Sequence, residues 1–137
     1  MLRFAPLMLG LSACMSFAQP RPYEPLRVQT GTAATTAAAA TKAALESAGY
    51  RLAGVGHGVL TAVSIPSRGM RDHVVIAIGD AGELSVDVRT EIASDGAWLS
   101  ADRTCAGYSY MREKKLLAMI LDEVHAQAEE TLQSSIE

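Results

Sequence analysis

The sequence predicts an α+β domain, a two-layer sandwich in which two helices pack on one face of an antiparallel meander of four or five strands. Two stretches with helical character, residues 33–48 and 109–132, flank a central region of β-branched runs and short turns. One run in that region, residues 83–92, alternates apolar and polar side chains, which is typical of a sheet with one wet face. The expected element order is α-β-β-β-β-(β)-α, with both helices covering the other face.

The first expected helix covers AATTAAAATKAALESA, residues 33–48. Alanine is the best helix former, and Gly49 stands where a C-cap glycine belongs. The competing interpretation, an alanine-rich continuation of a linker, does not account for Leu45 or for the Gly49-Tyr50 stop. One face at helical spacing is almost all small and lets the helix lie close to the sheet: Ala34, Ala38, Thr41, Leu45 and Ala48.

The expected strands follow one another closely and are separated by turn signals. After Tyr50 and Leu52, GVGH turns the chain, Pro66 ends the second run, and DAG and Asp95-Gly96 mark hairpin turns. Because the alternating run is regular, Leu84, Val86, Val88 and Ile92 are expected to face the helices. The expected runs after residue 58 are 59–65, 73–79, 83–92 and AWLSA at 97–101.

The second expected helix runs from Ser109, which caps it, to about Leu132. Its apolar stripe has helical spacing and is expected to contribute to the core. The stripe consists of Tyr110, Leu117, Ile120, Leu121, Val124, Ala128 and Leu132.

Residues 1–13 have the form of an export signal, with Arg3 followed by a short apolar stretch and small residues. Two cleavage positions fit. A cut after Ala13 leaves Cys14 as the lipidated first residue, since Leu11-Ser12-Ala13-Cys14 matches the bacterial lipobox at all four positions. A cut after Ala18 follows the small-x-small form of an ordinary signal peptidase site and leaves a soluble periplasmic protein.

Residues 14–32 are rich in proline and are expected to form an extended tether, with a single α+β domain over residues 33–137. Prolines block helix formation, and a spacer needs only this composition. A proline-rich docking segment is the alternative interpretation.

The chain resembles small bacterial envelope lipoproteins. The resemblance rests on the lipobox, on the element order and on the helix-to-strand junction ALESAGY, residues 44–50. Over residues 33–133 it extends to the helix-grip-like domains of accessory lipoproteins of outer-membrane protein assembly. It implies a lipid anchor on Cys14, and Met15 in place of Asp implies the outer membrane, facing the periplasm.

The residues that could carry chemistry are few. The net charge of −3 argues against nucleic acid as a partner. His57 is expected in a turn, His73 at a strand edge, and His125 on a solvated helix face near Asp122 and Glu129, so no metal and no cofactor is expected.

Cys105 is the candidate thiol of the domain, and Arg103 beside it could lower its pKa. A small buried residue at a strand-to-helix turn is the expected role, and catalysis or an intermolecular disulfide are the alternatives.

The segment DRTCAGYSYMREKK, residues 102–115, suggests a surface for a partner. An exposed Tyr108 beside Arg112 is a typical anchor, and Trp98 is expected to belong to the same surface, with packing in the core as its alternative role.

The sequence therefore predicts a non-enzymatic envelope lipoprotein that binds or scaffolds an envelope protein or cell-wall component through its open sheet face or this surface. The alternatives are a soluble periplasmic module for a small apolar ligand or lipid and, with less support, a thiol enzyme that uses Cys105.

Overall fold

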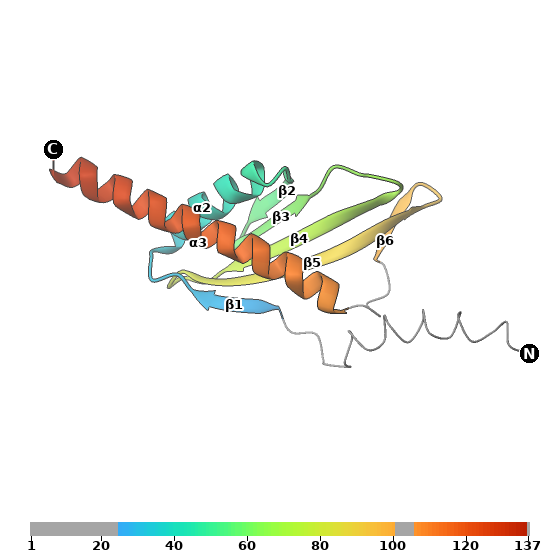
Figure 1. Cartoon of the computed structure of the whole chain (residues 1–137), viewed down its shortest axis with the longest axis horizontal. Helices are drawn as coiled ribbons and strands as arrows, with labels where there is room; N and C mark the ends of the chain where they lie inside the picture. Colours follow the sequence, from blue (N-terminus) through green and yellow to red (C-terminus); the bar gives the residue numbers. More distant parts are fainter. Residues whose placement is uncertain (1–24, 101–105, 137) are drawn as a thin grey trace, which may run out of the picture.

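A computed structural model describes residues 25–100 and 106–136 and has the predicted α+β architecture (Figure 1). Two helices pack on one face of an antiparallel sheet, so the predicted fold class is confirmed. In chain order the elements are β1 (Leu26–Gln29), α2 (Ala34–Ser47), β2 (Arg51–Gly56), β3 (Val59–Val63), β4 (Met70–Ile78), β5 (Glu83–Ser94), β6 (Ala97–Ser100) and α3 (Ala106–Ile136).

The sheet is a meander with two short strands sharing one edge. Strands β2, β3, β4 and β5 pair in sequence order, as expected from the short turns between them. Strand β4 pairs with β5 from Leu84 to Ile92, so the other side of β5 is left for both β1 and β6. Strand β1 pairs with the first part of β5 up to Val86, and β6 pairs with the last part from Glu91 onward.

Three two-residue turns have the same backbone shape. His57-Gly58, Arg68-Gly69 and Asp95-Gly96 each place both residues at positive φ. This is the type I′ geometry that matches the twist of antiparallel strands. The turn at Asp95-Gly96 confirms the expected hairpin. The turn at Arg68-Gly69 lets β4 begin at Met70, three residues earlier than the sequence indicates.

Strand β1 corrects the expected tether. Residues 14–32 were expected to be an extended spacer, but Leu26–Gln29 pair with β5 and belong to the sheet. Leu26 and Val28 are half-buried while Arg27 and Gln29 are exposed, which is the alternation of an edge strand. The neighbouring prolines hide this short alternation, because proline composition alone favours a spacer over a strand.

Helix α2 ends at the predicted position. Gly49 has φ +87°, its N–H bonds to the carbonyl of Glu46, and the N–H of Tyr50 bonds to the carbonyl of Leu45. These two bonds form a Schellman motif. The buried face is small, as expected, but it is rotated from the predicted stripe. It consists of Ala37, Ala40, Thr41, Ala44 and Leu45.

Helix α3 is longer than predicted at both ends, and two residues of the expected core stripe, Tyr110 and Leu132, are exposed instead. Leu116, Ile120 and Val124 are buried. Glu113 takes the buried position one turn before Leu116. The core lies between the helices and the sheet and holds Val74, Ile76, Leu84, Val86 and Val88 as its sheet side.

The helix layer and the sheet layer are offset along the long axis (Figure 1). We call the end with the turns at His57-Gly58 and 79–82 the near end, and the end with Arg68-Gly69 and Asp95-Gly96 the far end. After Val124 no residue of α3 up to Ile136 is buried, and this overhang, residues 125–136, projects past the near end. At the far end β4, β5 and β6 extend past α2.

Candidate functional site

The sheet has one face that carries no helix, which we call the open face. Alternation along the strands places the odd-numbered residues of β4 and β5 on it. Register aligns Arg51, Val63, His73 and Arg89 in one row across four strands. This face mixes charged and apolar side chains, since Val59, Val63 and Val75 share it with the charged residues, and its side chains come from every strand of the meander.

One set of contacts on the open face joins three residues at the far end. The Nε of Arg71 donates to the carboxylate of Glu91 at 2.8 Å, across the β4–β5 pair. The guanidinium carbon of Arg71 lies 4.2 Å from the ring centroid of Trp98, a cation–π contact. Because both contacts hold Arg71, the half-buried Trp98 ring is fixed against the sheet before any partner arrives.

The open face carries more positive than negative side chains. Asp87 pairs with Arg89 at 3.0 Å, and Glu91 pairs with Arg71. Arg27 on β1 lies opposite Ser85 and therefore shares this face with Arg51. Within residues 25–100 and 106–136 neither Arg27 nor Arg51 has an ion pair. Glu83, the first residue of β5, also lies on this face, so four arginines oppose three carboxylates. The face therefore has an excess of one positive charge, although the whole chain has a net charge of −3.

A polar cluster lies on the other side of the sheet, at the far end of the core. The guanidinium of Arg112 on α3 pairs with the carboxylate of Asp72 and donates to the hydroxyl of Thr90 at 2.7 Å. The Asp72 N–H donates to the Ser64 hydroxyl at 2.8 Å. Tyr50 interacts with this cluster: burial first, and then the Asp72 charge, raise its pKa above 10.0, while Arg112 opposes the shift.

This cluster holds α3 against the sheet rather than presenting free groups to solvent. Its four partners come from the α2–β2 junction, the residue after β3, β4 and β5, and Arg112 connects them to α3. A charge pair that is largely removed from water contributes to geometry more than to net stability. We therefore assign the cluster a structural role.

The predicted partner residues do not form one surface. Trp98 lies opposite Ala93 on the open face, whereas Arg112 contacts Thr90 on the helix side. The side chain of Tyr108 lies outside the described residues. The expectation of one patch of Trp98, Tyr108 and Arg112 is corrected, because the plane of the sheet separates the first from the third.

Several predicted residues lie outside residues 25–100 and 106–136. These are Ala13, Cys14, Ala18 and Cys105, so the lipidation, cleavage and thiol predictions stay predictions.

The three histidines lie apart. His57 occupies the β2–β3 turn with φ +53°, as expected, His73 is half-buried on the open face, and His125 is exposed on α3. In the described part of the chain no three His, Cys, Asp or Glu side chains are grouped as metal ligands. None of its helices combines the length and the apolar character needed to span a bilayer.

Sequence reasoning missed Arg71 and Glu113. The expected strand began at residue 73 and left position 71 outside it, but β4 begins at Met70 and places Arg71 beside Trp98. The i−3 spacing of Glu113 from Leu116 was the available signal for its burial, although a carboxylate on an apolar stripe is ordinarily assigned to solvent.

The sequence matches no protein-family model and shows no significant similarity to a curated protein. The arrangement of residues described above is therefore the basis for a functional proposal.

Proposed function

We propose that this protein is a non-enzymatic lipoprotein of the bacterial envelope, anchored through Cys14, that binds an envelope protein or cell-wall component with its open face. The observation that carries the proposal is the Trp98–Arg71–Glu91 contact on a sheet face that no helix covers. Tryptophan and arginine are the residues most enriched at binding hot spots. A ring fixed before binding loses little conformational freedom on contact.

The unpaired cations of the open face support an acidic partner. Arg27 and Arg51 flank the face on its two outer strands. Charges at the edge of a binding surface raise the rate of association with a partner more than they raise the affinity. An acidic protein segment or an anionic cell-wall polymer has the matching charge. Association is then expected to weaken as salt is raised, because exposed charges are screened.

Site-specific photocrosslinking in cells tests the surface. A benzophenone residue in place of Ala77, which is exposed on the open face, is expected to capture a discrete envelope component. The matched control replaces Lys42, which is exposed on α2 in the opposite layer. Trp98→Ala should lower the yield from position 77 at least about tenfold. Equal capture from both positions, or capture that Trp98→Ala leaves unchanged, contradicts the proposed surface.

The mass of the mature protein tests the anchor separately. A chain that begins at Cys14 and carries acyl groups supports the lipoprotein assignment. A chain that begins at Gln19 removes the anchor and makes the protein a soluble periplasmic one. The second result would leave the open-face prediction standing, because no step of that argument uses the lipid.

A further inference from the structure

We propose that copies of this chain associate head to tail, with the α3 overhang of one copy lying on the far end of the sheet of the next. The offset of the two layers leaves a helix without a sheet beneath it at one end and a sheet without a helix above it at the other (Figure 1). Each end has the layer that the other end lacks, and the contact would repeat the packing of α3 on β5 within one chain.

The exposed sheet surface is an apolar row. Met70, Ile92 and Leu99 are aligned in register across β4, β5 and β6, on the side that the helices cover elsewhere. Their exposed fractions are 46%, 44% and 56%. The Asp72–Arg112 pair lies between this row and the core, so the row is a separate apolar surface and not the partly exposed edge of the core. Aligned apolar side chains that remain accessible are typical of an interaction surface.

The overhang carries a matching apolar pair. Leu132 and Ile136 are 63% and 83% exposed and lie four residues apart, on one face of the helix. Such i, i+4 spacing places two side chains about 6 Å apart, close to the distance between neighbouring strands. The pair can therefore contact two members of the apolar row at once.

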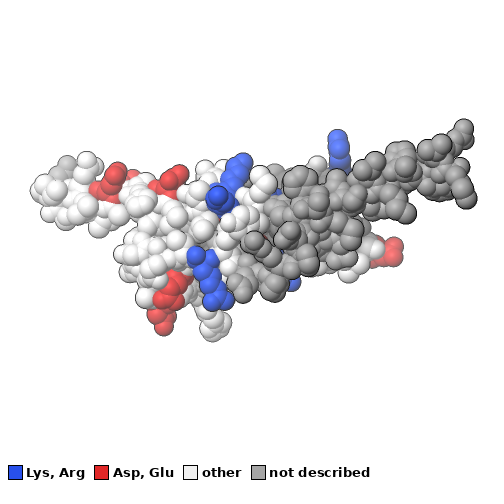
Figure 2. Space-filling model, turned by 60° about the horizontal axis from the view of Figure 1, so that its bottom comes forward, with Lys and Arg blue, Asp and Glu red and all other residues white. Residues whose placement is uncertain are grey.

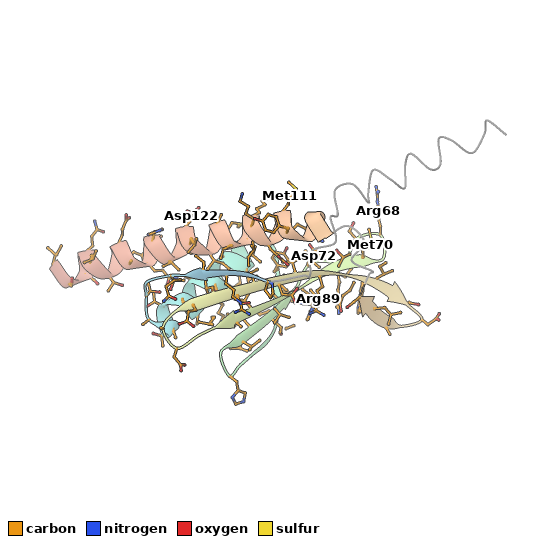
Figure 3. All side chains as sticks on the ribbon, turned by 90° about the horizontal axis from the view of Figure 1, so that it is seen from below. Arg68, Met70, Asp72, Arg89, Met111 and Asp122 are labelled. Carbon is orange, nitrogen blue, oxygen red and sulfur yellow. The ribbon has the colours of Figure 1, made fainter. Side chains whose placement is uncertain are left out.

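Charge favours this pairing of ends. Glu129 lies on the same helix face as Leu132 and Ile136, at i, i+3 and i+7, and no Lys or Arg follows Lys115 in the chain. Figure 2 shows acidic side chains along the projecting helix. At the far end Arg68 is exposed two residues before Met70, and Figure 3 shows it directed to the side of the sheet where α3 lies.

The contact joins two different surfaces, so it is heterologous and does not close on itself by two-fold symmetry. Each copy offers one overhang and one apolar row, and association therefore continues into an open chain. The surface is small, which corresponds to a dissociation constant of about 10 µM to 1 mM. The contact uses neither Trp98 nor the open face, so it stands independently of the proposed function.

Sedimentation velocity of the full chain over a concentration series tests the inference. The wild type is expected to form a growing series of oligomers up to about 1 mM. Leu132→Glu blocks the overhang and Ile92→Glu blocks the row, so each variant alone should remain a monomer. Mixed together they should form one 1:1 dimer and nothing larger, because one intact overhang meets one intact row.

Matched controls separate the inference from loss of folding and from other surfaces. Val55→Glu changes an apolar residue on β2 that is 70% exposed, and Trp98→Ala changes the open face; both should associate as the wild type does. A monomeric wild type over the whole series overturns the proposal. Failure of the mixed variants to form a dimer overturns it as well.

A charge swap fixes the register. Arg68→Asp and Glu129→Arg should each weaken association about tenfold, and the double variant should restore it to within about threefold. Aspartate is chosen because position 68 has φ +54°, a conformation that it tolerates better than most residues. A double variant as weak as the singles means that these two charges do not face each other and contradicts the proposed register.

Discussion

The carboxylate of Glu113 on α3 accepts a hydrogen bond of 3.0 Å from the backbone N–H of Val88 on β5. Val88 lies in the interval where neither β1 nor β6 pairs with the edge of β5. A side chain on the helix thus replaces a missing strand as the hydrogen-bond acceptor. This explains why a glutamate occupies a position on the buried stripe of α3.

Replacing Glu113 with alanine should destabilise the protein by about 1–3 kcal/mol, because the buried N–H of Val88 loses its acceptor. Glu113→Gln keeps an oxygen in place and should cost less. Urea denaturation, read as a shift in the midpoint, measures both. Equal losses for the two variants would contradict the hydrogen-bond explanation and favour a role for the charge.

Alkaline pH should weaken the contribution of Tyr50 to the stability of the folded protein. Its pKa in the folded protein is raised above 10.0, chiefly by burial, so the unfolded chain loses this proton first as the pH rises. The stability that the protonated phenol provides is complete below pH 10 and is lost above it.

The matched comparison is Tyr50→Phe, which should cost about 0.5–1.5 kcal/mol at neutral pH through the lost polar interaction of the phenol with Asp72. Urea unfolding of both proteins between about pH 8 and pH 11 should show this difference narrowing above pH 10. A difference that stays constant over the range would show that the phenol is not held in its protonated form.

Gly82→Ala should be the more damaging of two glycine substitutions. Gly82 has φ +81°, and an added Cβ would overlap the backbone oxygen of Thr32 and lie 2.6 Å from Oγ1 of Thr30. Gly31 has φ +71°, but its Cβ would meet nothing within 4 Å. We expect Gly31→Ala to destabilise the protein by about 1 kcal/mol through its backbone conformation alone, and Gly82→Ala to destabilise it by at least about 2 kcal/mol. Thermal unfolding distinguishes them, and equal losses would refute the close approach.

Ending the chain after Ala128 should leave stability within about 0.5 kcal/mol of the full chain, because none of the removed residues up to Ile136 is buried. The helical circular dichroism signal should fall while the unfolding midpoint stays fixed. A large drop in the midpoint would mean that the overhang stabilises the body of the domain. The same truncation is expected to abolish head-to-tail association.

The fold could be predicted from the sequence where patterns are local. The alternation in β5 and the glycines of the turns identify the meander, and Gly49 identifies the end of α2. Strand β1 could not be identified because four alternating residues next to prolines do not differ from a spacer. Its pairing depends on an edge of β5 that lies about 60 residues further along the chain.

The candidate site was less predictable because it depends on which face each side chain takes. Trp98 and Arg112 lie close in sequence, yet the sheet separates them. The start of the buried stripe of α3 was placed one turn too early, because hydrophobicity favours Tyr110 over Glu113 as a core residue. Only the gap in the edge pairing of β5 makes the carboxylate the better fit.

The position of β1 also determines how the domain bears a mechanical load. The chain enters β1 at Leu26, opposite Val86 in the first part of β5, and runs toward the near end, where Thr30 bonds to the carbonyl of Gly82. Inter-strand hydrogen bonds lie perpendicular to the strands, so a force that arrives along the chain at Leu26 shears all of them together. Shear shares the force among the bonds, whereas peeling from one end would break them in turn. A short strand in this orientation can therefore resist a pull that would unzip a hairpin.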